Sequence, residues 1–368
     1  MELHFTRTNG PVDDLIERLI RHAGEVRHPD FVREMILAAL KSGQECEDRI
    51  DLKIMNSTLK EMRFTTKIFS PYRGVRKVTI FGSARTRPKE SIYKMAQEFG
   101  RKLCGAGYMV ITGGGPGIMQ AVNEGAGPEN SFGVNIRLPF EQQMNPVLAN
   151  NPRAITYKYF FNRKVAFLKE SDAVALFPGG FGTLDEAMET LTLVQTGKRA
   201  PLPLILIDEP RGTYWTRYID FLKEELLTTG YINEADLDLF ERAESIEEAV
   251  QKIRFFYSGY HSLRYVGEKL VIRLLSPVGK EAAKELRAHF ADILVPEGEI
   301  ALSKALPAES DEPELAHLPR LVVDFDRKDF ARLRHLIDAI NRLQQHKGVS
   351  NLSRGLLETL SRRHGERL

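Results

Sequence analysis

Residues 173–195 read AVALFPGGFGTLDEAMETLTLVQ, and this stretch decides the fold. Its first five residues are apolar, as in a strand buried on both faces, and a glycine-rich turn separates them from a helical segment. The same order occurs twice upstream, where GSAR follows Phe81 and TGGGPGIM follows Ile111. Since the turns after parallel strands lie at one edge of a sheet, three such turns predict one shared edge.

Five short apolar runs alternate with amphipathic segments between residues 71 and 260. The predicted strands are 78–81, 108–111, 132–136, 173–177 and 204–207. The predicted helices are 91–103, 118–124, 160–169, 184–195 and 215–227. This alternation is typical of an α/β domain with a doubly wound, Rossmann-like parallel sheet.

The flanking regions have different patterns. Residues 1–70 carry apolar residues at helical spacing, in 12–20 and 31–40, and predict a helical N-terminal region. Residues 261–368 predict a small α+β extension. Its expected strands are 269–274 and 321–325, and its expected helices are 280–290 and 329–343.

Composition excludes several function classes. The 368 residues include 52 Lys and Arg against 50 Asp and Glu, so no basic field indicates a nucleic-acid partner. No apolar run approaches the ~18 residues that span a bilayer, and the first residues do not resemble a secretory signal. Only Cys46 and Cys104 are present, and no histidine lies between His28 and His261. We therefore expect a cytoplasmic protein without a disulfide framework, a His-ligated metal or a Ser-His-Asp triad.

The three turns predict a pocket for a nucleotide or a sugar phosphate. Glycine lets the backbone approach a phosphate, and the helix N-termini beyond such turns present free N–H groups. Neither the P-loop nor the dinucleotide-binding fingerprint is matched, so an ATPase or a dehydrogenase is not favoured. Each turn taken alone could equally be a tight strand–helix connection that binds nothing.

Two motifs resemble those of one family. The strings GGGPGIM at 113–119 and PGGFGTLDE at 178–186, with Arg163-Lys164 between them, resemble the LOG ("lonely guy") family of nucleoside 5′-monophosphate phosphoribohydrolases, often labelled lysine decarboxylases. The resemblance covers about residues 75–256. The carboxy-terminal extension and the tracts at 159–162 and 195–198 resemble a longer bacterial branch, which includes pyrimidine/purine nucleotide monophosphate nucleosidases.

That resemblance implies a function, a set of site residues and partners. The expected reaction is hydrolysis of the N-glycosidic bond of AMP-like nucleotides to free base and ribose 5-phosphate, without metal or cofactor. The expected catalytic pair is Arg163 and Glu186, and a homodimer or higher homo-oligomer and a regulatory nucleotide are also implied. The expected nucleotide-binding residues are Gly82, Ser83, Gly114, Gly115, Gly179, Gly180, Gly182 and Thr183.

Elementary chemistry agrees with this expectation but leaves alternatives open. A carboxylate can stabilise the oxocarbenium-like charge that develops on ribose and can orient the attacking water. Thr183 and Glu186 also match a capping box, in which Glu186 would only close the helix start. The apolar residues Leu184, Ala187, Met188, Leu191 and Val194 could form either an interface or ordinary core. A nucleotide-binding or carrier protein without catalysis remains the second hypothesis, and a pyridoxal-phosphate-dependent lysine decarboxylase is the third.

Overall fold

The computed structural model describes residues 9–139 and 144–345, and the chain divides into two compact units, Met1–Lys67 and Ile68–Leu368. The first unit confirms the predicted helical N-terminal region. It contains α1 (Pro11–His22), α2 (Pro29–Glu45) and most of α3 (Arg49–Phe69). Arg33 of α2 donates a hydrogen bond of 2.5 Å to Asp13 of α1, and both side chains are buried.

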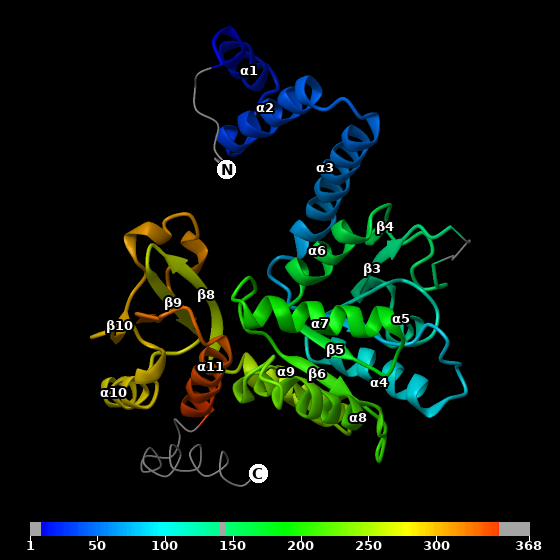
Figure 1. Ribbon diagram of the computed structural model, residues 1–368, viewed down its shortest axis with the longest axis vertical. Helices are drawn as coiled ribbons and strands as arrows, with labels where there is room; N and C mark the ends of the chain where they lie inside the picture. Colours follow the sequence, from blue (N-terminus) through cyan, green and yellow to red (C-terminus); the bar gives the residue numbers. More distant parts are fainter. Residues whose placement is uncertain (1–8, 140–143, 346–368) are drawn as a thin grey trace. The chain divides into compact units, whose positions relative to one another are not determined.

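The second unit is built on a seven-stranded parallel sheet of order β4-β3-β2-β1-β5-β6-β7 (Figure 1). The strands are β1 (Lys77–Phe81), β2 (Met109–Thr112), β3 (Ser131–Ile136), β4 (Ala154–Tyr157), β5 (Ala173–Leu176), β6 (Leu204–Ile207) and β7 (Glu241–Ala243). The α/β class and the five predicted strands are confirmed. The two edge strands, β4 and β7, were not predicted, because each is short and only partly buried.

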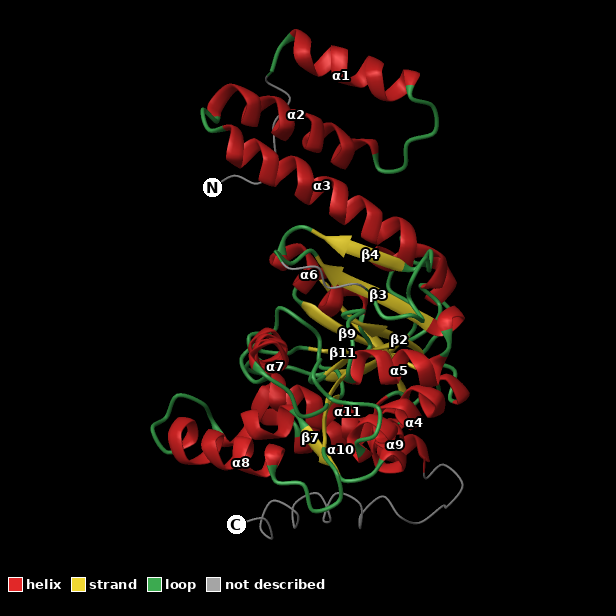
Figure 2. Cartoon of the chain, turned by 90° about the vertical axis from the view of Figure 1, so that its right-hand side faces the viewer, coloured by secondary structure: helices red, strands yellow, loops and turns green. Residues whose placement is uncertain are grey.

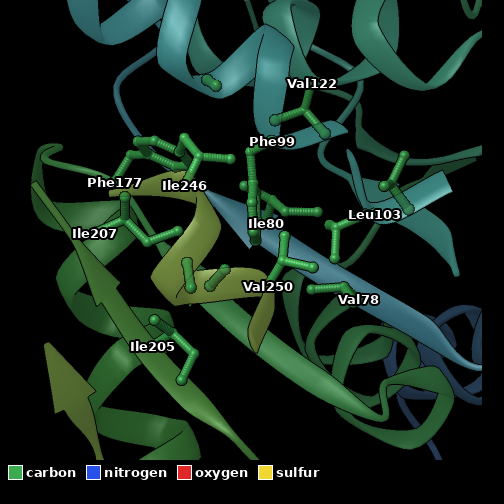
Figure 3. Packing of buried hydrophobic residues seen from close by; sticks show 14 of the residues in the cluster. Val78, Ile80, Phe99, Leu103, Val122, Phe177, Ile205, Ile207, Ile246 and Val250 are labelled. Atoms are coloured by element: carbon green, nitrogen blue, oxygen red, sulfur yellow. The ribbon is translucent and has the colours of Figure 1, made fainter. Parts of the chain in front are cut away.

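Helices cover both faces of this sheet, which makes it doubly wound. One face packs against α4 (Ser91–Gly105), α5 (Ile118–Ala126) and α9 (Ile246–Phe256), and the close-up in Figure 3 shows this core around Ile80, Phe99 and Val250. The other face packs against α6 (Phe160–Glu170), α7 (Phe181–Gln195) and α8 (Tyr214–Phe221), which a π-helical segment, Leu222–Leu227, extends.

The order of the strands sets the position of a binding site. The first strand of the sheet, β1, lies in its middle. The chain then adds β2, β3 and β4 on one side and returns to add β5, β6 and β7 on the other. The topological switch therefore lies between β1 and β5. In open α/β sheets, ligands bind beyond the carboxyl ends of the strands at this point.

The residues after α9 form the predicted α+β extension, which has its own antiparallel sheet of order β10-β11-β9-β8. It consists of two successive β-β-α segments, which lie to the left of the parallel sheet in Figure 1 and overlap it in the turned view of Figure 2. The elements are β8 (Tyr260–Val266), β9 (Lys269–Leu274), α10 (Lys280–His289), β10 (Ile300–Ser303), β11 (Arg320–Val323) and α11 (Phe330–Gln345). Below its surface, Glu309 pairs with Arg273 at 2.7 Å and with Arg320 at 3.2 Å, and all three side chains are buried.

Candidate active site

The three glycine turns meet at the carboxyl edge of the sheet, at the switch between β1 and β5. The Ser83 N–H, in the turn after β1, donates to the Pro178 carbonyl in the turn after β5 at 3.1 Å. The Ser83 carbonyl accepts a bond of 3.0 Å from the Ile118 N–H, at the start of α5. Gly82 and Ser83 therefore lie between the other two turns, and the structure brings together the turns that the sequence predicted to share an edge.

Two glycines are required for this close approach. Gly117 has a φ of 69°, and a Cβ added there would lie 2.3 Å from the Ser83 carbonyl oxygen. A Cβ at Gly179 would lie 2.1 Å from Thr183 Oγ1 and 3.0 Å from the Ser83 nitrogen. Gly180 and Gly182 differ from these, because an added Cβ would meet no atom within 4 Å at either residue. They border open space at the start of α7.

A buried polar network supports the turn after β2. The Gly114 N–H donates to Thr112 Oγ1 at 3.1 Å, and the Gly114 carbonyl accepts from the Asn145 N–H at 2.8 Å. The Asn145 amide group donates to the Gly115 carbonyl at 3.1 Å and to Asn123 Oδ1 at 3.0 Å. Asn123 and Asn145 could not be predicted from the sequence, because their relation to the turn depends on long-range packing.

Glu186 lies inside α7 rather than at its start. The helix begins at Phe181 with Gly180 as its N-cap, and no side chain caps it. Thr183 is therefore the third helical residue and Glu186 the sixth, so the capping-box interpretation is wrong. The Glu186 side chain is buried, and among the residues the structure describes its Oε2 has no hydrogen-bond partner. Most buried polar side-chain atoms have a hydrogen-bond partner, so this oxygen is a candidate for contact with a bound ligand.

The surroundings of Glu186 place its ionisation near neutrality. Burial raises the pKa of Glu186 to about 7, while the Lys164 ammonium, 3.8 Å from Oε2, works in the opposite direction. Lys164 also lies 2.8 Å from Asp185 and 2.9 Å from Glu189. Burial alone would lower the pKa of Lys164, but the hydrogen bonds to these two carboxylates outweigh it and raise the pKa.

Arg163 packs on the turn after β2 and interacts electrostatically with Glu186. Its Nε donates to the Val134 carbonyl at 2.9 Å, and its guanidinium lies 5.0 Å from the centre of the Phe167 ring. A Cβ at Gly113 would lie 2.5 Å from Arg163 Nη2, so the guanidinium packs directly on that turn. Burial lowers the pKa of Arg163, and the negative charge of Glu186 opposes this effect.

Apolar side chains are exposed beside these residues on α6 and α7. We call this set the α6/α7 patch, and its members are Phe160, Phe161, Val165, Phe181 and Met188. Phe181, inside the glycine motif, is 94% exposed. Of the apolar residues left open by the sequence, Ala187 and Val194 are core and Met188 is exposed. A cavity of about 440 Å³ lies between α7 and α8, lined by Leu184, Thr213, Tyr214, Arg217 and Tyr218.

Two negative findings apply to residues 9–139 and 144–345 only. No group of three or more His, Cys, Asp or Glu side chains is arranged to hold a metal ion there. Within the same ranges, no helix combines the length and the apolar character needed to cross a membrane.

Comparisons with known proteins match part of the second unit, including the turn after β5. A family model described as "Possible lysine decarboxylase" matches residues 118–253. Cytokinin riboside 5′-monophosphate phosphoribohydrolase LOG3 of Arabidopsis thaliana is 26% identical over 184 residues, 48% of this chain and 81% of that protein. The LOG enzyme of Oryza sativa subsp. japonica is 26% identical over 190 residues, 50% of this chain and 75% of that protein.

Solved structures of similar fold include the molybdenum cofactor carrier protein of Chlamydomonas reinhardtii. It is 19% identical, covers 49% of this chain and 96% of its own, and superposes with a TM-score of 0.34. The family model covers the part of the chain where Arg163, Glu186 and the PGGFGTLDE motif occur. About half of this chain is therefore similar to phosphoribohydrolases of the LOG family.

Proposed function

We propose that this protein hydrolyses the N-glycosidic bond of nucleoside 5′-monophosphates, with AMP-like purine nucleotides as substrates, to free base and ribose 5-phosphate. The observation that carries the proposal is the Glu186 carboxyl group, which is buried near Arg163 and the glycine turns and has one oxygen without a hydrogen bond among the described residues. The names of the two plant relatives, both phosphoribohydrolases of a nucleoside 5′-monophosphate, support the same reaction class.

The substrate phosphate would bind where the turns meet. The N–H groups at the start of α7 face the open space beside Gly180 and Gly182, and a helix N-terminus favours an anion. Gly82, Ser83, Gly114 and Gly115 would contribute backbone groups from the neighbouring turns, and Gly179 and Thr183 would complete the wall. Because hydrogen bonds hold these turns to one another, the site would be formed before substrate arrives.

Glu186 would perform the hydrolytic step. Its ionised carboxylate stabilises the positive charge that develops on ribose C1′ as the C1′–N bond lengthens. It then takes a proton from the water whose oxygen bonds to C1′. Glu186 then gives this proton to the departing base nitrogen. One water is consumed in each turnover, and Glu186 is ionised again at its end. A pKa near 7 suits a group that must both accept and release a proton at neutral pH.

Arg163 would position the substrate against Glu186. Its guanidinium is fixed by the Val134 carbonyl and by packing on Gly113, so the remaining donors are held in one orientation. A fixed guanidinium can bind a phosphate or a ribose hydroxyl with little loss of entropy. It also adds positive charge beside Glu186 and favours the ionised carboxylate.

The alternatives explain fewer of these observations. A carrier protein would need the turns but not a buried carboxyl group with a pKa near 7. A lysine decarboxylase that uses pyridoxal phosphate needs a neutral amine for the Schiff base. Lys164 is held by Asp185 and Glu189, and its raised pKa keeps it an ammonium ion.

The α6/α7 patch supports a homodimer as part of this proposal. Contiguous exposed apolar side chains usually mark an interface, and a two-fold dimer is the commonest solution for one chain. Since Arg163 and Glu186 are on the same two helices, the site would lie near the dimer interface.

The function can be tested with the purified full chain and a panel of substrates. AMP, GMP, CMP and UMP are each incubated with the protein, and free base and ribose 5-phosphate are measured by chromatography. We expect equal amounts of the two products from at least one purine nucleotide. Tight binding of AMP without release of base would instead favour the carrier hypothesis.

A further inference from the structure

For its length, the N-terminal unit exposes many more large apolar side chains than the rest of the described chain. The described residues contain twenty large apolar side chains that are exposed, and ten of them lie in the 53 residues from Val12 to Phe64. They are Val12, Leu15, Leu19, Phe31, Met35, Leu40, Ile50, Met55, Leu59 and Phe64. Large exposed apolar patches on a folded protein mark interaction surfaces.

These side chains are ordered along the helices. On α1, Val12, Leu15 and Leu19 follow one another at spacings of three and four residues, so they share one face of the helix. Phe31 and Met35 on α2, and Met55 and Leu59 on α3, have the spacing of four that also places two residues on one face. We call these three rows the apolar stripes of the N-terminal unit.

The unit cannot stabilise itself through its own core. Among the described residues up to Lys67, Ile16 and Leu37 are the only large apolar side chains that are buried. Helices of this length depend on packing of an apolar face against a neighbour for most of their stability. The stripes therefore require a covering surface that is present whenever the chain is folded.

Charge and area both favour a second copy of the chain as that surface. Residues 1–67 contain 11 Lys and Arg against 12 Asp and Glu, a net charge of −1, so a strongly acidic or basic partner gains little by binding. The seven side chains of the stripes, each about half exposed, leave about 700 Å² of accessible surface per chain at roughly 200 Å² for a large residue. A standard protein interface buries about 800 Å² on each partner.

We propose that the N-terminal units of two copies of this chain pair through these stripes in a two-fold symmetric helical interface. In such an isologous contact the same surface serves both chains, which an apolar and nearly neutral surface allows. This interface uses different residues from the α6/α7 patch. Use of both two-fold interfaces would assemble more than two chains, and four chains form a closed tetramer when the two axes cross at a right angle.

Light scattering on the full chain tests the proposal. The variant Leu15→Glu/Leu19→Glu places two charges on the α1 stripe, and we expect its molar mass to be half that of the wild type at micromolar concentration. Arg18→Glu changes an exposed charge on the same helix and should leave the mass unchanged. If the double variant keeps the molar mass of the wild type, the proposal is wrong.

Cross-linking of unmodified chains covers the case in which the variant merely unfolds. Wild-type chains labelled with ¹⁴N and ¹⁵N are mixed, allowed to exchange and treated with a lysine cross-linker. We expect mixed-isotope links among Lys41, Lys53 and Lys60, which are in or beside α2 and α3. If these lysines link only to residues 68–368 of the same chain, the chain covers its own stripes and the proposal is wrong.

Discussion

Replacing Lys164 with glutamine should move the pH dependence of base release to higher pH. The Lys164 ammonium lies 3.8 Å from Glu186 Oε2 and favours the ionised carboxylate that we assign to catalysis. Two unit charges about 4 Å apart interact by about 1 kcal/mol in water and by about 4 kcal/mol at an effective dielectric constant of about 20. Since one pKa unit corresponds to 1.36 kcal/mol, the pKa of Glu186 should rise by roughly one to three units in the variant.

The direction of the shift in the pH profile follows from the ionisation of the Glu186 carboxyl group. With a pKa of about 7 in the wild type, Glu186 loses its charge as the pH falls through neutrality, so kcat should decline below pH 7. In Lys164→Gln this decline should begin at higher pH, while activity recovers toward pH 9 once Glu186 ionises. Initial rates of adenine release at saturating AMP, measured from pH 5 to 9.5, give both profiles.

Two control variants make the test specific. Lys164→Arg keeps the positive charge and should keep the wild-type profile. Lys169→Gln removes an exposed lysine near the end of the same helix, where it pairs with Glu170, and should also leave the profile unchanged. A Lys164→Gln profile that does not move, or that moves to lower pH, would refute the reasoning.

Three further predictions concern the turns and the extension. Gly179→Ala should weaken AMP binding at least tenfold by calorimetry, because its Cβ would lie 2.1 Å from Thr183 Oγ1, whereas Gly180→Ala meets no atom within 4 Å and should affect binding little. Asn145→Ala removes the bonds that hold the turn after β2, so KM for AMP should rise more than kcat falls; an unchanged KM would count against the network. Burial alone would raise the pKa of Glu309, but the Leu306 amide and the Arg273 and Arg320 guanidinium groups hold it at about 2. The ionised carboxylate therefore stabilises the fold above the ordinary pKa of 4.5, and this stabilisation is lost as the pH falls toward 2. Glu309→Gln should lower the free energy of unfolding by about 3–5 kcal/mol at pH 7, and the melting temperature should then depend less on pH in the acid range.

Much of the fold could be predicted because its central strands are continuously apolar. β1, β2, β3, β5 and β6 are each buried along their whole length, and glycine-rich turns follow β1, β2 and β5. The edge strands β4 and β7 are only partly buried, and their mixed composition gives no such signal. β8 and β10 of the extension were missed for the same reason.

The candidate site shows where sequence patterns are insufficient. The start of α7 was predicted at Leu184, because Phe181 and Gly182 are weak helix formers, but the helix begins at Phe181. That shift of three residues moves Glu186 from the first turn into the second, where a capping role is impossible. The sequence places Asp185, Glu186 and Glu189 close together on one helix, but only the packing of α6 on α7 shows that Lys164 lies among these carboxylates.

The central claim is tested most directly by comparing the wild type with Glu186→Gln in the release of free base from AMP. Glutamine keeps the size of the side chain and removes the charge, and a general acid–base group is typically worth about 10²- to 10⁴-fold in rate. We predict a fall in kcat of that order, with the melting temperature and the AMP dissociation constant, measured beside it, nearly unchanged. Release of base by Glu186→Gln at a rate close to the wild type would contradict the account.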